Sequence, residues 1–240
     1  MRASASTRAR QSVAVLILEL AHIGEAIPTL SGDRKHILWL DYDGLLEKSH
    51  LDDLTLGASY LSVGSIILIT VDVEPSEKSD DPEEWRQHFI DETGDYFSPK
   101  WKLSDFALSK LPKRHVEVLN HAIKAGLAGR TGVEFIPMFN FLYQDGLQML
   151  TLGGMIGTPT EARQVKASGL SSTMYFRDSF KTPPCVIRIP KLTRKERQYL
   201  DGFMPSKDRW VPKAFELDPE LVMAYRDVYR FCPTYAELML

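Results

Sequence analysis

Two aspartates follow an apolar run near the start of the chain and are the residues best placed to do chemistry. Residues 36–40 read HILWL, and Asp41, Asp43 and Gly44 follow within four positions. A buried strand of a parallel sheet carries the residues after it to the carboxyl edge of the sheet, where open α/β folds bind ligands. A carboxylate at that edge can orient an acceptor group or take its proton. The structural alternative is that Asp41 ends the strand and that Asp43 and Gly44 form a turn.

Further polar or aromatic residues could complete such a site. Tyr42 lies between the two aspartates and could stack on a ligand ring, although alternation along a strand would equally place it under the next helix. Thr70, Asp72 and Glu74 end the next apolar run and are expected at the same sheet edge, where Glu74 could instead begin an acidic loop. His22 follows the first apolar run and could contact a ligand or act as a base, but a lone histidine there is more often a loop residue.

The segments around these residues predict an α/β fold. β-Branched and leucine-rich runs indicate buried strands, and an amphipathic pattern indicates a helix between two of them. An Asp145-Gly146 pair between two apolar runs is a strong hairpin signal. The strands are expected at 13–20, 36–41 and 65–73, the helix at 49–62 and the hairpin at 133–156. This order predicts a doubly wound parallel sheet that finishes in an antiparallel hairpin.

The same pattern predicts three regions along the chain. They are a disordered leader at 1–12, an α/β domain at 13–157 and a C-terminal loop and helical appendage at 158–240. Residues 74–95 are acidic and are expected to form an exposed loop with one short helix around Trp85. Residues 158–183 are expected to be rich in loops, and two later helices begin at the caps Thr193 and Asp218.

Composition narrows the function classes. The 240 residues carry a net charge of −3, which gives no general nucleic-acid footprint. A basic group in the appendage, Lys191, Arg194, Lys195 and Arg197, could touch phosphates, although a solvated helix face explains it more simply. No apolar run reaches the roughly 18–20 residues of a membrane span, and the two cysteines match no metal or redox spacing. These features predict a cytoplasmic protein without a metal site.

The order of the segments resembles the second half of a Rossmann-like S-adenosylmethionine-dependent methyltransferase. Four stretches are similar to its third strand and following loop, its fourth strand with an acidic end, its glycine-preceded fifth strand and its reversed last two strands, and they lie at 18–30, 36–44, 61–73 and 133–156. Together with IPKLTRKERQYLD at 189–201 and YRFCPTYAEL at 229–238, they resemble bacterial proteins labelled O-methyltransferases. The resemblance covers nearly the whole chain from about residue 13.

This resemblance implies a cofactor, a set of site residues and a missing part of the family's fold. It implies S-adenosyl-L-methionine as cofactor and an unknown oxygen or nitrogen acceptor, with Asp41 and Asp43 as catalytic residues. It implies that His22, Ile23, Asp41 and Tyr42 bind the cofactor, although His22 stands where the family has an acidic residue. The family's first two strands, with the glycine-rich loop and the ribose-binding acid, have no counterpart here. We therefore expect an incomplete sheet, a truncated protein of low activity alone, and an open edge that recruits a second copy or a partner chain.

Two other functions stay open at this point. The LDYDGLL stretch also resembles the nucleophile motif of haloacid-dehalogenase-type phosphotransferases, with Asp41 as nucleophile, Asp43 as acid/base, Thr70 as phosphate ligand and Mg²⁺ held by carboxylates. Leu45 stands where that family has threonine, and no later strand ends in the expected acidic pair. The third possibility is a non-catalytic interaction domain that keeps the sheet and binds no cofactor.

Overall fold

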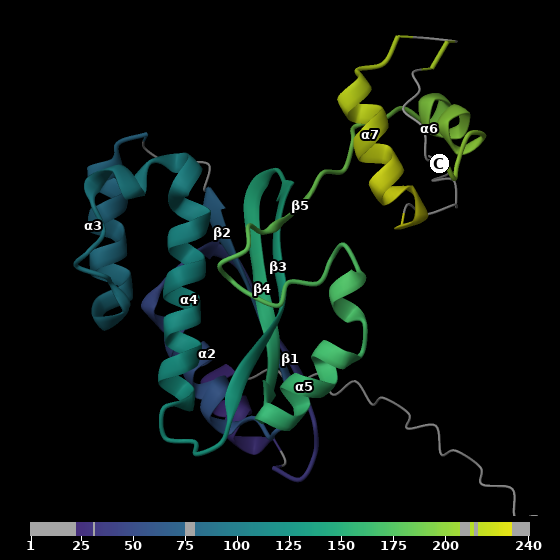
Figure 1. Cartoon of the computed structure of the whole chain (residues 1–240). Coiled ribbons are helices and arrows are strands. Elements are labelled where there is room, and N and C mark those ends of the chain that lie inside the picture. Colours follow the sequence, from purple (N-terminus) through teal and green to yellow (C-terminus); the bar gives the residue numbers. More distant parts are fainter. Residues whose placement is uncertain (1–22, 31, 75–79, 207–211, 214–215, 232–240) are drawn as a thin grey trace, which may run out of the picture.

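A five-stranded mixed sheet forms the centre of the fold (Figure 1). The structure is a computed structural model that describes residues 23–30, 32–74, 80–206, 212–213 and 216–231. The strands are β1 (Ile37–Leu45), β2 (Ile66–Glu74), β3 (Glu134–Asp145), β4 (Leu147–Gly157) and β5 (Cys185–Ile187), and their order is β1-β2-β4-β3-β5. β1 and β2 are parallel, β4 is antiparallel to both β2 and β3, and β5 is parallel to β3.

The predicted parallel pair and the antiparallel hairpin are confirmed. β2 follows β1 through the helix α2 (Lys48–Tyr60), which is the helix expected at 49–62. The hairpin turns at Gly146, whose φ of 81° lies in the left-handed region that glycine adopts without strain. The chain is therefore a Rossmann-like α/β protein whose sheet finishes in a reversed hairpin.

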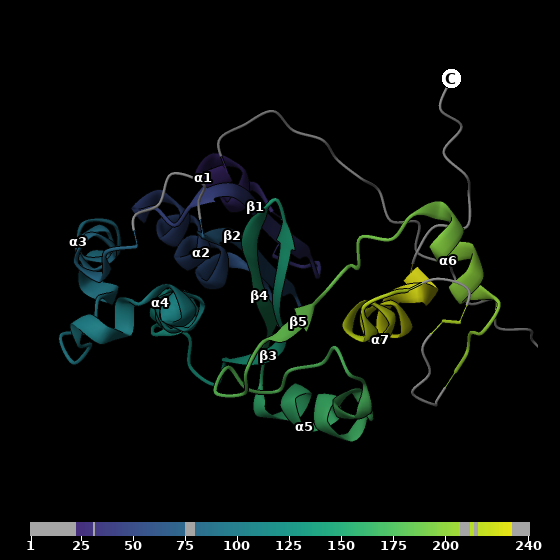
Figure 2. The same ribbon diagram turned by 90° about the horizontal axis from the view of Figure 1, so that it is seen from above.

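The helices before the hairpin all lie on one side of the sheet (Figures 1 and 2). They are α1 (Ile23–Ala26), η1 (Ile27–Thr29), α2, α3 (Pro82–Thr93) and α4 (Leu111–Leu127), with the short turns η2 (Gly94–Tyr96), η3 (Leu103–Phe106) and η4 (Leu108–Lys110) between the last two. Leu40, Ile69 and Leu152 stand in register on neighbouring strands and are buried beneath these helices. This helix-facing layer is the main hydrophobic core.

The opposite face of the sheet is open at β1. The side chains of Ile37 and Trp39 point to the face opposite Leu40, and these two residues are 75% and 58% exposed. β1 is also an edge strand, because no strand among the described residues pairs with its second side. A parallel sheet usually has both faces covered, so this exposed surface is where a ligand or another chain has access.

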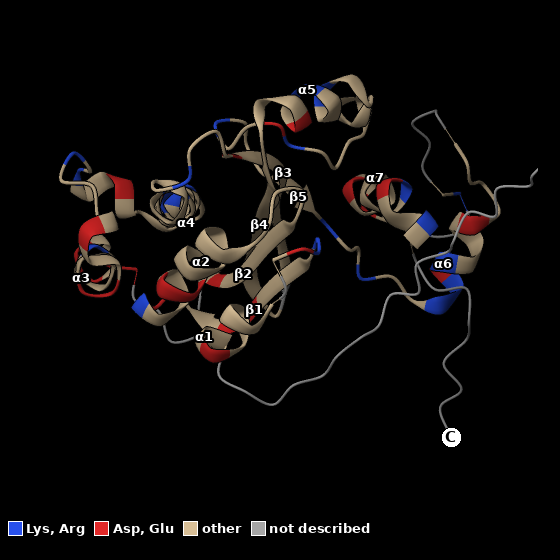
Figure 3. Ribbon diagram, turned by 90° about the horizontal axis from the view of Figure 1, so that it is seen from below, with Lys and Arg blue, Asp and Glu red and all other residues tan. Residues whose placement is uncertain are grey.

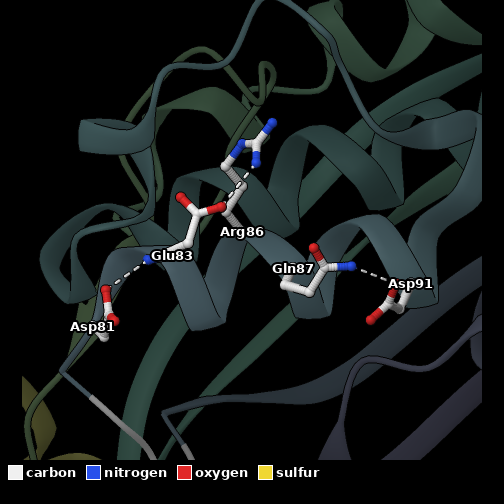
Figure 4. A network of polar contacts seen from close by, with 5 residues as sticks. All are labelled: Asp81, Glu83, Arg86, Gln87 and Asp91. Carbon is white, nitrogen blue, oxygen red and sulfur yellow. Dashed lines mark hydrogen bonds and ion pairs between the residues drawn. The ribbon is translucent and has the colours of Figure 1, made fainter.

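Acidic residues organise the helix α3 (Figure 4). The side chain of Asp81 accepts a hydrogen bond from the backbone N–H of Glu83 at 2.9 Å and so caps the first turn. On the helix surface Arg86 donates to Glu83 at 3.0 Å and Gln87 donates to Asp91 at 2.8 Å. The short helix expected around Trp85 therefore extends over twelve residues.

One expectation about local structure is wrong. β1 does not end at Asp41 but continues to Leu45, with a register shift opposite β2 between these residues. The region 158–183 is rich in loops as expected, although it begins with the helix α5 (Pro159–Ala167), whose cap Thr158 exchanges hydrogen bonds with Glu161. Three expectations lie outside the described residues: the leader at 1–12, the strand at 13–20 and the placement of His22.

The C-terminal part has a small core of its own. Its elements are η5 (Leu170–Ser172), α6 (Arg194–Asp201), α7 (Pro219–Val228) and η6 (Tyr229–Phe231), and Thr193 and Asp218 cap the two helices as predicted. Leu200, Leu217, Val222 and Tyr225 form a cluster separate from the main core. Basic residues gather on α6 (Figure 3).

Candidate functional site

A row of side chains crosses the open face of the sheet beside the predicted site. Asp41 stands in register with Thr70 on β2, and Thr70 stands in register with Thr151 on β4. The indole Nε1–H of Trp39 donates to Oγ1 of Thr70 at 2.9 Å, and the two threonine hydroxyls lie 2.9 Å apart. Thr151 in turn donates to the hydroxyl of Tyr143 at 3.4 Å. A continuous hydrogen-bonded chain therefore links four strands.

This chain fixes an aromatic ring at the protein surface. Thr70 and Thr151 are 1% and 6% exposed, so their hydroxyls are firmly placed, whereas most of the Trp39 side chain is in contact with solvent. A buried anchor and an exposed ring together give a surface that is ready to stack on a ligand or to hold a cation against its π face. Sequence reasoning missed Trp39, although its spacing of two from Asp41 puts both side chains on one face of the strand.

The two predicted catalytic aspartates lie on the last part of β1. Asp41 and Asp43 are both exposed, and Asp41 stands opposite Thr70 and two positions after Trp39, on the same face of the strand. A register shift follows Asp41, and irregularities of this kind are common next to functional sites. The catalytic role of the two aspartates stays a prediction.

Tyr42 points the other way, under α2. Its hydroxyl donates to Oδ2 of Asp53 at 2.8 Å, and its ring stacks on that of His50 with centroids 3.8 Å apart. Burial and the neighbouring Asp53 raise the pKa of Tyr42 well above its usual value, so the phenol stays a donor. Burial lowers the pKa of His50, while the carboxylates of Glu47, Asp53 and Glu92 act in the opposite direction. The position fits the packing role weighed for Tyr42, and its cofactor role stays a prediction.

Three other residues of the predicted site lie on α1 and β2. Ile23 begins α1 and packs against the main core, so its cofactor role also stays a prediction. Asp72 follows Thr70 by two positions on β2 but is 1% exposed. Glu74 is the last residue of β2. The candidate site therefore consists of Trp39 and Asp41, with Thr70 and Thr151 beneath them, and Asp43 lies on the same strand after the register shift.

Thr70 also weakens the phosphotransferase interpretation. In that interpretation its hydroxyl binds a phosphate, but it is buried and already engaged by Trp39 and Thr151. Within the described parts of the chain, no three His, Cys, Asp or Glu side chains come together as metal ligands would. The geometry therefore favours an aromatic and carboxylate surface over a phosphate site.

Comparison with known proteins gives the family. Residues 8–240 match the model of a family described as "Putative O-methyltransferase". The chain belongs to this family. Comparison with curated proteins finds no match.

As a member of this O-methyltransferase family, the chain has a methyltransferase-like function, and its mixed five-stranded sheet agrees with the fold that the resemblance implied. Among the described residues, no helix is both long and apolar enough to cross a membrane. The helix α6, which carries basic residues, lies apart from β1 (Figure 3). Arg194 and Lys195 are exposed, whereas Arg197 is half-buried. A nucleic-acid acceptor stays a prediction.

Proposed function

We propose that this chain catalyses methyl transfer from S-adenosylmethionine to an oxygen acceptor on the open face of β1 and β2. The observation that carries the proposal is the exposed indole of Trp39, fixed through Thr70 and neighboured by the carboxylate of Asp41. When bound, the cofactor supplies a methyl group on a positively charged sulfur. An aromatic face and carboxylates are the groups that attract such a cation, so the residues fit the cofactor.

Each residue has a separate task in this mechanism. The ring of Trp39 holds positive charge against its face, and Thr70 and Thr151 keep the ring in place. Asp41 orients the acceptor hydroxyl and takes its proton as the oxygen becomes a nucleophile. Asp43, two residues further along β1, adds a second negative charge near Asp41. Most of the rate enhancement comes from positioning the acceptor against the methyl group.

Titration calorimetry with two nucleosides tests the role of Trp39. S-adenosylmethionine carries the sulfonium charge and S-adenosylhomocysteine does not, so a cation–π contact predicts tighter binding of the charged compound by about two- to fivefold. Trp39→Ala should remove this preference, whereas Trp39→Phe, which keeps a π face, should retain part of it. An unchanged preference in Trp39→Ala, or no binding of either compound, would show that the cofactor is not held here.

Substitution of the aspartates tests the catalytic assignment. Asp41→Asn preserves shape but cannot accept a proton, so transfer of labelled methyl to a panel of phenols and alcohols should fall by about a hundredfold or more. Binding of S-adenosylhomocysteine should change little, since that compound is not the proton donor. Asp43→Asn should have a smaller effect on transfer. If both variants keep the wild-type transfer rate, the assignment of Asp41 and Asp43 is wrong.

A further inference from the structure

A cavity lies between α4 and β3, on the helical side of the sheet and away from the Trp39 surface. Its volume is about 1190 Å³, which is large enough for a small organic ligand. The segment 178–184 forms the third wall. Arg177 closes this segment into a loop, because its Nε donates to the carbonyl of Pro183 at 3.2 Å and its backbone N–H donates to the carbonyl of Met138 on β3 at 2.9 Å.

Asn140 lines this cavity without a hydrogen-bond partner among the described residues. It is 1% exposed, and within this part of the chain neither its Oδ1 nor its Nδ2 makes a hydrogen bond. It occupies the β3 position in register with Leu152, in the row that is otherwise apolar and faces the helices. Buried amides are almost always hydrogen-bonded, so an unpaired one in an apolar row calls for a partner beyond the described residues, such as a bound ligand.

The cavity walls restrict what that partner can be. The rings of Phe135, on β3, and Phe180, in the segment 178–184, have centroids 5.8 Å apart where these two walls meet, and they suit a flat, apolar body. The charged residues of the wall balance, with three lysines (Lys113, Lys124, Lys181) against three acids (Glu117, Glu134, Asp178). A carboxamide offers one donor and one acceptor side by side.

We propose that this cavity binds a neutral, planar heteroaromatic ligand whose edge carries a hydrogen-bond acceptor next to a donor, and that Asn140 pairs with both. The edge of a nucleobase has this pattern, and asparagine recognises adenine in this bidentate way. Because the amide atoms are covered, the ligand reaches them by displacing side chains of the cavity wall. Asn140 and the Trp39 surface lie on opposite faces of the sheet, so this site is separate from the proposed methyl-transfer site.

A pair of nucleosides tests the proposal. Adenosine offers the donor and acceptor edge, whereas purine riboside has the same shape but lacks the exocyclic amino donor. Calorimetric or NMR titration of the full chain should give adenosine an affinity about ten- to a hundredfold higher than purine riboside. Asn140→Leu, which is similar in size and has no amide, should abolish that difference. Cytidine and nicotinamide extend the search to other rings with a donor and an acceptor.

Two further measurements separate this site from the methyl-transfer site and from a folding defect. Trp39→Ala should leave adenosine affinity unchanged, and Asn140→Leu should leave the preference for S-adenosylmethionine over S-adenosylhomocysteine unchanged, because these two compounds share the adenosine part and differ in the sulfonium charge. Thermal unfolding of Asn140→Leu should remain cooperative, with a melting temperature no lower than that of the wild type, because the substitution removes an unpaired buried amide. The proposal is overturned if no probe binds at millimolar concentration, if Asn140→Leu binds adenosine as the wild type does, or if Trp39→Ala is the variant that loses it.

Discussion

At the scale of single residues, the site depends on an alternation that gives neighbouring side chains opposite roles. Trp39 and Asp41 face the open side of the sheet, while Leu40 and Tyr42 face the helices. Tyr42 is held by Asp53 and His50 and so ties the end of β1 to α2. Residues that hold the strand against the helices therefore alternate along β1 with residues proposed to meet the ligand. A substitution on one face of the strand can leave the side chains on the other face in place.

Because of His115, the stability of the folded chain should fall as the pH drops below 6.5. Its ring is fully buried in α4, where Nδ1–H donates to the carbonyl of Leu111 at 2.8 Å, and burial lowers its pKa from 6.5 to about 4. Between these two values the unfolded chain binds a proton that the folded chain does not. The free energy of unfolding therefore stays at its full value above pH 6.5 and falls by about 3 kcal/mol as the pH drops to about 4.

Urea unfolding at a series of pH values measures this slope. His115→Met should flatten the dependence of the free energy of unfolding between pH 6.5 and 4, whatever its effect at pH 7. Some slope should remain, because burial also lowers the pKa of His50. His121→Met, at an exposed position of the same helix, should keep the wild-type slope. A slope that does not change in His115→Met would show that this histidine titrates normally in the folded chain.

At the scale of elements, the contact between α2 and α4 depends on a glycine. A Cβ at Gly126 would lie 2.3 Å from the carbonyl oxygen of Thr55 and 2.8 Å from Cβ of Ala58. On an exposed helix, replacing glycine by alanine stabilises by about 1 kcal/mol. At Gly126 the clash of the new Cβ with the backbone should outweigh this gain. We therefore expect Gly126→Ala to lower the free energy of unfolding by about 1–3 kcal/mol.

Gly129 provides the matched comparison for Gly126. It follows the end of the same helix, and a Cβ added there would meet no atom within 4 Å. Gly129→Ala should therefore change the free energy of unfolding by less than about 0.5 kcal/mol. Equilibrium denaturation of the two variants side by side is the measurement, and equal stabilities would mean that the two helices are not in close contact at Gly126.

Sequence patterns were sufficient for the elements that carry strong local signals. The parallel pair and the hairpin follow from apolar runs and from Asp145-Gly146, and the caps Thr193 and Asp218 mark where α6 and α7 begin. The end of β1 was misjudged because polar residues that suggest a turn can also lie on the open face of an edge strand. β5 was missed because it has three residues and is defined by its pairing with β3.

The site itself was only partly predictable. Asp41 and Asp43 are identified by their place after an apolar run, which is a local signal. The hydrogen bonds that join Trp39 to Thr70 and Thr151 link residues 31 and 81 positions apart, so they depend on the register of three strands. The isolation of Asn140 depends on what surrounds it in space, and no sequence pattern reports that.

At the scale of the whole molecule, the sheet has one face covered by helices and a second face that is open at β1, and its first strand has a free side among the described residues. We expect this edge to join two copies of the chain. Unpaired strand edges recruit other strands, and exposed apolar side chains on the same strand add to the driving force. Ile37 is 75% exposed at the start of β1 and lies two residues from Trp39.

Sedimentation velocity over a range of concentrations tests this association. The wild-type chain should shift from monomer towards dimer as its concentration rises, and Ile37→Lys should remain monomeric at the same concentrations, because a charged residue at a strand edge opposes pairing. Leu103→Lys is the control, since Leu103 is also 48% exposed but lies in η3, beside α3 and α4 on the helical side. If Leu103→Lys dissociates the dimer as well as Ile37→Lys does, general hydrophobicity rather than the β1 edge drives association. A wild-type chain that stays monomeric throughout would show that the edge does not recruit a second copy.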